Sequence, residues 1–209
     1  LAVATSELSW LLERGYKVTG AIALVGNRHA LAARARLAVQ RAACSDAELE
    51  ARGARRVTGL ADLRDQRLLI DGFNCIIALE AALSGGVLII GRDGVLRDMS
   101  SVHGSYRRVE ETERAVTLIV EALEAASVGE VAVYLDKPVS NSGRLAGIIR
   151  RLAADRFPIT IELVDDPDRR LASEGGAGEG VVCSVDGVIL DRCGAWIDLP
   201  AAGLAHHGL

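Results

Sequence analysis

Short apolar runs alternate with helical patterns along the chain from residue 68 onwards. The apolar runs predict strands at 68–71, 130–136, 160–166, 181–187 and 195–200. Segments rich in Ala, Leu and Glu predict helices at 75–85, 109–126 and 142–155. An Asp-Gly pair between apolar residues predicts a hairpin within 87–98. Because continuous Val, Ile and Leu runs indicate strands buried on both faces, we expect an α/β fold with a mostly parallel sheet and helices on both faces.

The first 66 residues have a different pattern, which is helical throughout. Leucines at helical spacing, Ala-rich segments and a Ser-Asp pair at 45–46 predict three or four short helices. Through Arg67 the chain carries eleven Lys and Arg against seven Asp and Glu, whereas the remainder carries thirteen against twenty-one. We therefore expect a basic helical region at 1–66 and an α/β domain at 67–209. The helical region is either a nucleic-acid-binding module or a solvated cap on the α/β domain.

Composition restricts where the protein works. No apolar run approaches the roughly 18 residues that a transmembrane helix needs, and the first residues lack the basic start of a signal peptide. We expect a cytoplasmic protein with no membrane partner. The sequence does not begin with Met, which suggests a fragment or a processed start. The four cysteines form no C-x-x-C pair, so a zinc site is not expected.

Four of the predicted strands end in aspartate. The acids at these ends are Asp71, Asp136, Asp186 and, after the 160–166 strand, Asp165, Asp166 and Asp168. A single Asp before Gly is more often a turn residue than a ligand. In a parallel sheet, however, the carboxyl ends of the strands meet at one edge, where ligands bind. Converging carboxylates raise each other's pKa unless a cation lies between them, so we expect a Mg²⁺ or Mn²⁺ site.

Several of these segments are similar to a known family. IDGFN at 70–74, the acid at 136, the acidic DDPDRRL segment and VVCSVDGVILD at 181–191 resemble the PIN-type nuclease fold, in particular its NYN branch. That branch carries a DGYN-like first motif and a late T/S-x-D motif, and here Phe73 replaces the more usual Tyr. The resemblance implies a metal-dependent ribonuclease whose clustered acids position one or two Mg²⁺ or Mn²⁺ ions.

Carried over position by position, the resemblance implies roles for individual residues. The implied catalytic residues are Asp71, Asp136, Asp168 and Asp186. The implied metal ligands are Asp71, Asp136, Asp186 and Asp166, the last of which competes with Asp168 for the third position. Asn74 would orient Asp71 or the substrate, and Ser184 would bind substrate beside the last acid.

Two further segments hold candidate substrate-binding residues. After the strand at 130–136, a turn into the next helix contains Ser140, Asn141, Ser142 and Arg144. Backbone amides at the start of a helix, together with an arginine, suit a phosphate. An ordinary helix cap is an equally good interpretation of Ser142 alone. In the long polar segment before residue 109, Arg107 and Arg108 would hold phosphates, unless that segment is a solvated loop.

The whole chain also resembles an uncharacterised prokaryotic family that joins a short helical N-terminal region to such a domain. The segments LVGNR, IDGFN, GRDGVLRD, HGSYRRVEET and PVSNSGRLA carry this second resemblance, which implies no established activity. No P-loop, dinucleotide-binding or hydrolase-elbow motif is present. Three hypotheses follow: a metal-dependent ribonuclease, a non-catalytic RNA- or nucleotide-binding module, and a small-substrate phosphatase. The expected partner is nucleic acid, above all RNA, with self-association into a homo-oligomer as a further option.

Overall fold

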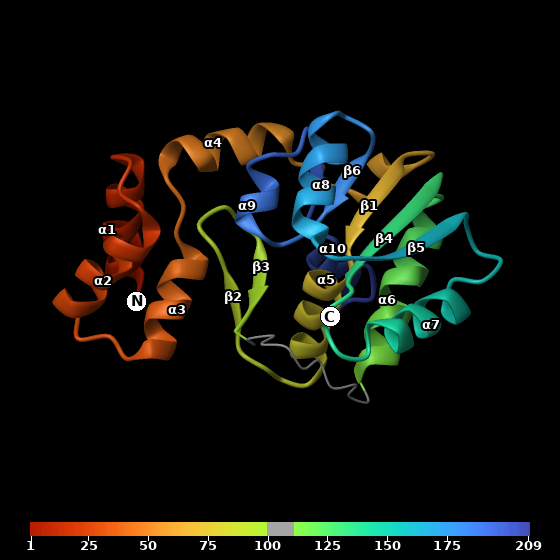
Figure 1. Ribbon diagram of the computed structural model, residues 1–209, viewed down its shortest axis with the longest axis horizontal. Helices are drawn as coiled ribbons and strands as arrows, with labels where there is room; N and C mark the ends of the chain where they lie inside the picture. Colours follow the sequence, from red (N-terminus) through yellow and green to blue (C-terminus); the bar gives the residue numbers. More distant parts are fainter. Residues whose placement is uncertain (100–110) are drawn as a thin grey trace.

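In the computed structural model, which describes residues 1–99 and 111–209, a helical region precedes a five-stranded, all-parallel sheet (Figure 1). The sheet has the strand order β5-β4-β1-β6-β7. Its strands are β1 (Arg67–Asp71), β4 (Glu130–Asp136), β5 (Ile159–Val164), β6 (Val181–Cys183) and β7 (Trp196–Ile197). The predicted hairpin is the antiparallel pair β2 (Leu88–Ile90) and β3 (Leu96–Asp98).

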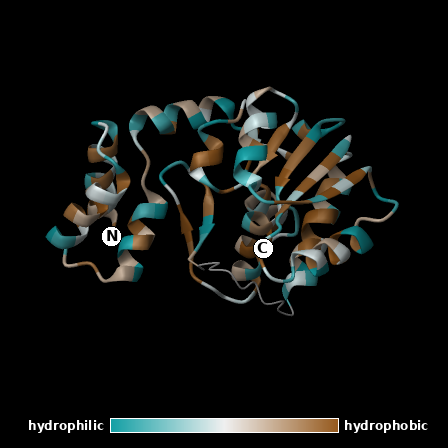
Figure 2. Cartoon of the chain, in the orientation of Figure 1, coloured by the Kyte–Doolittle hydropathy of each residue, from teal (hydrophilic) through white to brown (hydrophobic). Residues whose placement is uncertain are grey.

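Strand β1 lies at the centre of the sheet and is buried on both faces. It pairs in parallel with β4 and β6, so that Leu68 lies beside Val131 of β4. Its side chains alternate between the two faces because the strand repeat is two residues. Leu68 and Ile70 belong to one core, whereas Leu69 belongs to a second core together with the fully buried Trp196. The hydrophobic colouring of the sheet in Figure 2 shows why both faces need cover.

Helices cover both faces of the sheet, which confirms the predicted fold class. The helices on the first face are α5 (Gly72–Leu83), α6 (Glu111–Ala126), α7 (Ser142–Leu152) and α10 (Leu199–His206). The helices on the second face are α8 (Pro167–Gly176) and the short α9 (Gly187–Leu190). Helix α6 buries an apolar stripe and carries acids in its first turn, where the helix dipole favours negative charge. In the described residues, no helix has the length and apolar character of a membrane span.

Gly72 begins α5 directly after β1, and its missing side chain lets the helix lie against β4. A Cβ atom at this position would lie 2.5 Å from the Leu135 Cδ2 atom and 3.2 Å from the Tyr134 carbonyl oxygen. The Asp71-Gly72 pair is not a turn with positive φ, because the chain passes straight from the strand into the helix. Asp71 thereby becomes the residue that caps α5.

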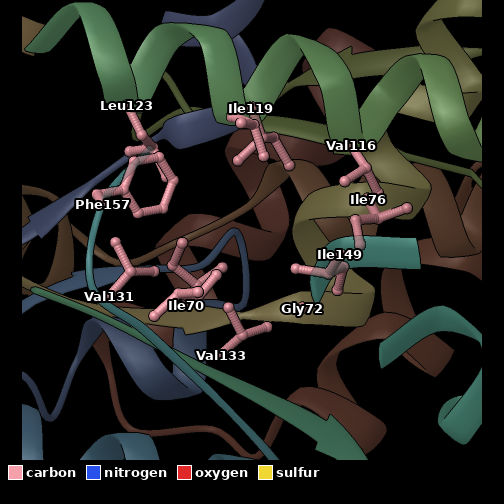
Figure 3. Close-up of a pocket in the computed structure, with 12 residues that line it drawn as sticks. Ile70, Gly72, Ile76, Val116, Ile119, Leu123, Val131, Val133, Ile149 and Phe157 are labelled. Carbon is pink, nitrogen blue, oxygen red and sulfur yellow. The ribbon is translucent and has the colours of Figure 1, made fainter. Parts of the chain in front are cut away.

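A small void lies in the first core, between α6 and the sheet (Figure 3). Its volume is about 20 Å³, and its lining is entirely apolar. Figure 3 shows Phe157 and Leu123 on one side and Val131 on the other. A space of this size without polar groups is a packing defect rather than a ligand site.

Val131→Ile is expected to raise the free energy of unfolding by up to about 1 kcal/mol, because the added methylene fills part of the void. Val182, which is fully buried in the second core, provides the matched control. The same exchange there overpacks the core and is expected to cost about 1–3 kcal/mol. Chemical denaturation of both variants measures the difference. Equal destabilisation by the two exchanges would show that the void does not accept the methylene.

The helical region consists of α1 (Ala2–Glu13), α2 (Val18–Arg28), α3 (Ala33–Ala42) and α4 (Asp46–Arg55), and a 3₁₀ turn, η1 (Leu60–Leu63), leads into β1. The first three helices pack around a small core of their own that includes Leu8 and Val39. Helix α4 begins with the predicted cap, since Ser45 accepts a hydrogen bond from the Glu48 amide in a capping box. In Figure 1, α4 runs from this bundle to the α/β domain, so a helix joins the two parts.

Buried charges tie α4 to the α/β domain. The Arg52 guanidinium pairs with Asp93 of the β2–β3 turn at 2.6 Å and with Asp191, after α9, at 2.7 Å. Arg97 of β3 pairs with the same Asp93 at 2.7 Å and donates to the Val185 carbonyl at 2.8 Å. Although burial opposes ionisation of Asp93, hydrogen bonds and charges from Arg97 and Arg52 hold its pKa below the ordinary value. Strong contacts therefore cross the division that the sequence predicts at residue 66.

Candidate active site

The predicted aspartates lie at the carboxyl edge of the sheet, and they follow the order of the strands. Asp136 ends β4, Asp71 ends β1 and Asp186 follows β6. Asp166 and Asp168 lie after β5, at the start of α8. Because all the strands are parallel, these ends share one edge. Neighbouring strands are about 4.8 Å apart, so the four strand ends span an edge of roughly 14 Å.

Three of these aspartates cap the helices that follow them. The Oδ1 atoms of Asp71, Asp166 and Asp186 each accept a backbone N–H from the first turn of α5, α8 or α9. Capping satisfies N–H groups that the first turn leaves without a partner. Among the described residues, nothing donates a hydrogen bond to the Oδ2 atoms of Asp166 and Asp186. A structural role as a cap is therefore compatible with a role as a ligand in the same side chain.

Asp71 is the buried member of the group, with 4% of its surface exposed. Its Oδ2 atom accepts hydrogen bonds from the Asn74 side-chain amide at 2.5 Å and from the Ser184 hydroxyl at 2.9 Å. Ser184 in turn accepts the Asp186 amide at 3.1 Å. Burial raises the pKa of Asp71 to about 6 against the effect of these hydrogen bonds, and the charge of Asp168 adds to the rise. Asn74 thus orients Asp71, which is one of the two roles expected of it.

Asp168 lies where the electrostatic effects of the other acids overlap. Partial burial and the charges of Asp186, Asp136 and Asp166 raise its pKa. The pKa of Asp136 is raised as well, by partial burial and by the charge of Asp166. Salt screens the interaction between distant charges, so carboxylates that raise each other's pKa lie near one another. The five members of this carboxylate group are Asp71, Asp136, Asp166, Asp168 and Asp186.

The donor chemistry of the group suits a hard divalent cation, since it offers carboxylate oxygens and no thiolate or imidazole. Within residues 1–99 and 111–209, no three His, Cys, Asp or Glu side chains are gathered as a ready-made metal site. Mg²⁺ is commonly bound through one or two carboxylates, with water and substrate phosphate oxygens completing its shell. The arrangement fits a cation held in this way, with part of the coordination supplied by the substrate.

The turn between β4 and α7 contains the predicted phosphate-binding residues. Ser140, Asn141 and Arg144 are exposed there, and Asn141 has a left-handed backbone conformation with a φ of 69°. Ser142 is buried instead, and its hydroxyl lies 2.5 Å from two backbone carbonyl oxygens of the turn. This geometry corrects the expectation that Ser142 faces a substrate. The alternative interpretation is wrong as well, because Asn141 is the N-cap residue of α7 and no side chain caps the helix. The Ser142 hydroxyl instead donates to carbonyl oxygens and stabilises the turn.

The basic residues expected to neutralise nucleic acid are only partly presented to solvent. Arg28 lies 3.4 Å from Glu7, and Arg36 folds back onto the loop before α3 and onto α2. Arg107 and Arg108 lie outside the described residues. Part of the positive charge of the helical region is therefore used inside that region.

Two hollows flank the carboxylates, one on either side. The first has a volume of about 480 Å³ beside β5 and α8, and Lys137 and Arg169 bring positive charge to it. The second, also of about 480 Å³, lies between the helical region and the strand ends and includes Asn74 and Asp186. Sequence analysis missed Arg169 and the second hollow. The RR pair directly after Asp168 is a signal for the former, whereas the hollow depends on contacts between distant segments.

Comparison with known proteins places the chain in a family. A model of the domain of unknown function DUF5616 matches residues 60–202, and a model of the protein of unknown function DUF434 matches residues 1–55. The chain belongs to the DUF5616 family. It is 35% identical over 147 residues to the uncharacterized protein MJ0935 of Methanocaldococcus jannaschii, and the match covers 70% of each chain. No solved structure is significantly similar to it.

The DUF5616 match contains all the predicted aspartates, and the DUF434 match contains most of the helical region. The coarser prediction, an uncharacterised family that joins a helical N-terminal region to an α/β domain, is thereby confirmed. None of these names concerns an activity. Function therefore has to be argued from the chemistry of the site.

Proposed function

We propose that this DUF5616 protein is a metal-dependent nuclease that hydrolyses phosphodiester bonds in RNA. The observation that carries the proposal is the position of Asp168, whose pKa is raised by partial burial and by carboxylates delivered from β4, β6 and its own segment. Gathering like charges does not help the fold, because it opposes their ionisation. A cation-assisted phosphoryl-transfer reaction uses clustered carboxylates to hold the cation. The resemblance of IDGFN and of the late S-x-D segment to PIN-type nucleases supports the same reaction.

One or two of the strand-end acids would hold the divalent cation, with water and substrate phosphate completing its shell. The candidates for these ligands are Asp71, Asp136, Asp186 and one of Asp166 and Asp168. When bound, the cation supplies charge stabilisation and lowers the pKa of a water molecule. Asn74 and Ser184 fix the Asp71 carboxylate in place through hydrogen bonds of 2.5 and 2.9 Å. A ligand held in advance in this way does not have to be ordered during the reaction.

Basic and polar residues beside the acids suit the phosphates that flank the cleaved bond. Lys137 and Arg169 line the hollow next to β5, and Arg144 is exposed at the start of α7. Ser140 and Asn141 belong to the same exposed turn. Lysine and arginine bind nucleic-acid phosphates without reading sequence, so binding to single-stranded RNA should weaken as salt rises.

Asp168→Asn is expected to lower the rate of Mg²⁺- or Mn²⁺-dependent RNA cleavage by roughly 100-fold, because it removes a preorganised charge at the centre of the group. Cleavage of an end-labelled single-stranded RNA, with and without EDTA, measures the effect. Asp155→Asn is the matched control: Asp155 is exposed near the opposite edge of the sheet, and Asn accepts its left-handed φ of 62°. Cleavage that Asp168→Asn leaves unchanged, or that EDTA does not stop, would remove the proposal.

A second candidate function is hydrolysis of a phosphate ester on a free nucleotide. The hollow that includes Asn74 and Asp186 has a volume of about 480 Å³, within the range of small-molecule sites. Turnover of nucleoside monophosphates without cleavage of oligonucleotides would favour this function. Salt-dependent RNA binding that survives Asp71→Asn, with turnover of neither substrate, would favour the third hypothesis, a non-catalytic binding module.

A further inference from the structure

The hollow between the helical region and the strand ends, which we call the interdomain cleft, is built by both parts of the chain. Its lining includes Leu12 of α1, Leu37 and Gln40 of α3, and Asn74, Asp186 and Val188 of the strand-end edge. Asp186 is one of the carboxylates described above, and Asn74 donates a hydrogen bond to another, Asp71. A ligand in the interdomain cleft therefore lies next to the candidate reaction centre.

The arginines that line the interdomain cleft are already paired. Arg52 binds Asp191 through two hydrogen bonds of 2.7 and 2.8 Å. Arg41 lies 3.5 Å from Asp98, and Arg97 is committed to the acid of the β2–β3 turn. Each of these cations therefore has an acid partner within the described residues, and the cleft offers little to a phosphate. It suits the uncharged part of a ligand better.

The rest of the lining combines apolar side chains with two amides and four acids, namely Gln40, Asn74, Glu48, Asp98, Asp186 and Asp191. Val188 is 54% exposed and Val18 is 37% exposed, while Leu12 and Leu37 are half-buried. The exposed Gln40 side chain makes no hydrogen bond with any residue that the structure describes. Its amide offers both a donor and an acceptor, as the edge of a nucleobase does. A lining that has apolar side chains beside polar groups suits a small ring with apolar faces and a hydrogen-bonding edge.

We propose that the interdomain cleft binds one base of an RNA strand, beside the phosphate at the carboxylate edge, and that Gln40 reads the identity of that base. That the bound strand is RNA rests on the proposed function. An unpaired base can be splayed out of its stack and recognised by hydrogen bonds to its edge. The lining found among the described residues has no aromatic ring, so aliphatic contacts hold the base. The DUF434 helices thus supply specificity, and the DUF5616 domain supplies the reaction centre.

Base preference is the first readout of this proposal. Four single-stranded RNAs that differ only in the nucleotide next to the cleaved bond, tested on either side of it, give the ratio of highest to lowest kcat/KM. Gln40→Ala is expected to reduce that ratio about tenfold, through a lower kcat/KM on the best substrate, because a lost base contact removes discrimination. Gln66→Ala, an exposed glutamine at the opposite edge of the sheet, is the matched control. An unchanged ratio in Gln40→Ala overturns the proposal.

Crosslinking separates this proposal from the proposed function. A short RNA that carries 4-thiouridine is irradiated with Asp71→Asn protein, and mass spectrometry identifies the modified peptides. Crosslinks in α1–α3 or at residues 185–191 support the base site. They do so even when the wild type cleaves no RNA, in which case the nuclease proposal alone fails. Crosslinks confined to other parts of the chain overturn the base site, while cleavage by the wild type would leave the nuclease proposal standing.

Discussion

Asp71→Asn is expected to abolish metal-dependent RNA cleavage and to make the folded protein more stable at neutral pH. Both effects follow from removing the charge of one buried carboxylate, whose burial raises its pKa to about 6. A buried ion destabilises the fold, and such groups persist where function needs them. We expect the cleavage rate to fall at least about 1,000-fold, as it does when a preorganised charged group is removed from a reaction centre.

The gain in stability depends on pH in a defined direction. The pKa of Asp71 in the folded protein lies above its ordinary value of 3.8, so between pH 3.8 and about 6 the native state binds more protons than the unfolded chain. The free energy of unfolding of the wild type therefore falls as pH rises through this window, and it stays at the lower level above it. The raised pKa corresponds to roughly 3 kcal/mol, and a weakened hydrogen bond in the variant offsets about 1 kcal/mol of the gain.

Thermal unfolding of wild type and Asp71→Asn, near pH 4 and near pH 7.5, measures this difference. The variant is expected to melt about 4–8 °C higher near pH 7.5 and no higher near pH 4. Mn²⁺ is expected to raise the melting temperature of the wild type and not that of the variant, because the proposed metal site needs the Asp71 carboxylate. Asp155→Asn should show neither effect. A variant that melts lower at both pH values would mean that the ionised carboxylate stabilises the fold, contrary to this account.

The order of strands and helices in the α/β domain could be predicted because the local patterns are strong there. Apolar runs define β1 and β4, an apolar stripe defines α6, and an Asp-Gly pair defines the β2–β3 hairpin. The order of the strands within the sheet could not be predicted in this way. Strand β6 lies beside β1, far from it in the sequence, because that placement lets each strand bury both of its faces. Periodicity along one segment carries no information on such a choice.

The convergence of the aspartates could be predicted from parallel strands alone, but the use of each acid could not. Asp198 also follows a strand, yet it is buried, caps α10 and accepts the Leu96 amide at 2.7 Å. Ser142 shows the same limit, since its buried hydroxyl donates to the Asp136 carbonyl and thus has neither of the two roles expected from the sequence. The interdomain cleft was beyond prediction because Gln40 and Asp186 come together only through the packing of separate modules.

Arg52→Met is expected to lower the free energy of unfolding by about 3–5 kcal/mol, the cost of breaking a buried charge network by removing one partner. The side chain of Arg52 is 6% exposed, and that of Asp93, its partner at 2.6 Å, is 2% exposed. Met occupies a similar volume but donates no hydrogen bond, so the Asp93 carboxylate keeps Arg97 and the Val95 amide as its donors among the described residues. Asp191 loses both of the hydrogen bonds that it receives from Arg52.

Urea denaturation of Arg52→Met against Arg92→Met measures this cost. Arg92 lies in the β2–β3 turn next to Asp93 and pairs with Asp46, whose side chain is 71% exposed. Loss of the Arg92 side chain is therefore expected to cost less than about 1 kcal/mol. Equal costs for the two exchanges would show that the buried network contributes no more than a surface pair does.

Arg52→Met also tests how α4 supports the candidate active site. The Arg52 guanidinium approaches the Gly187 carbonyl at 3.4 Å, and Arg97 holds the Val185 carbonyl at 2.8 Å, so the two arginines bracket Asp186. Without Arg52 this loop is held from one side, and RNA cleavage should fall at temperatures well below unfolding. Cleavage that persists unchanged up to a lowered melting temperature would limit Arg52 to a role in stability. Loss of cleavage while the variant is still folded would mean that α4, the helix that joins the two family modules, also positions Asp186 in the proposed reaction centre.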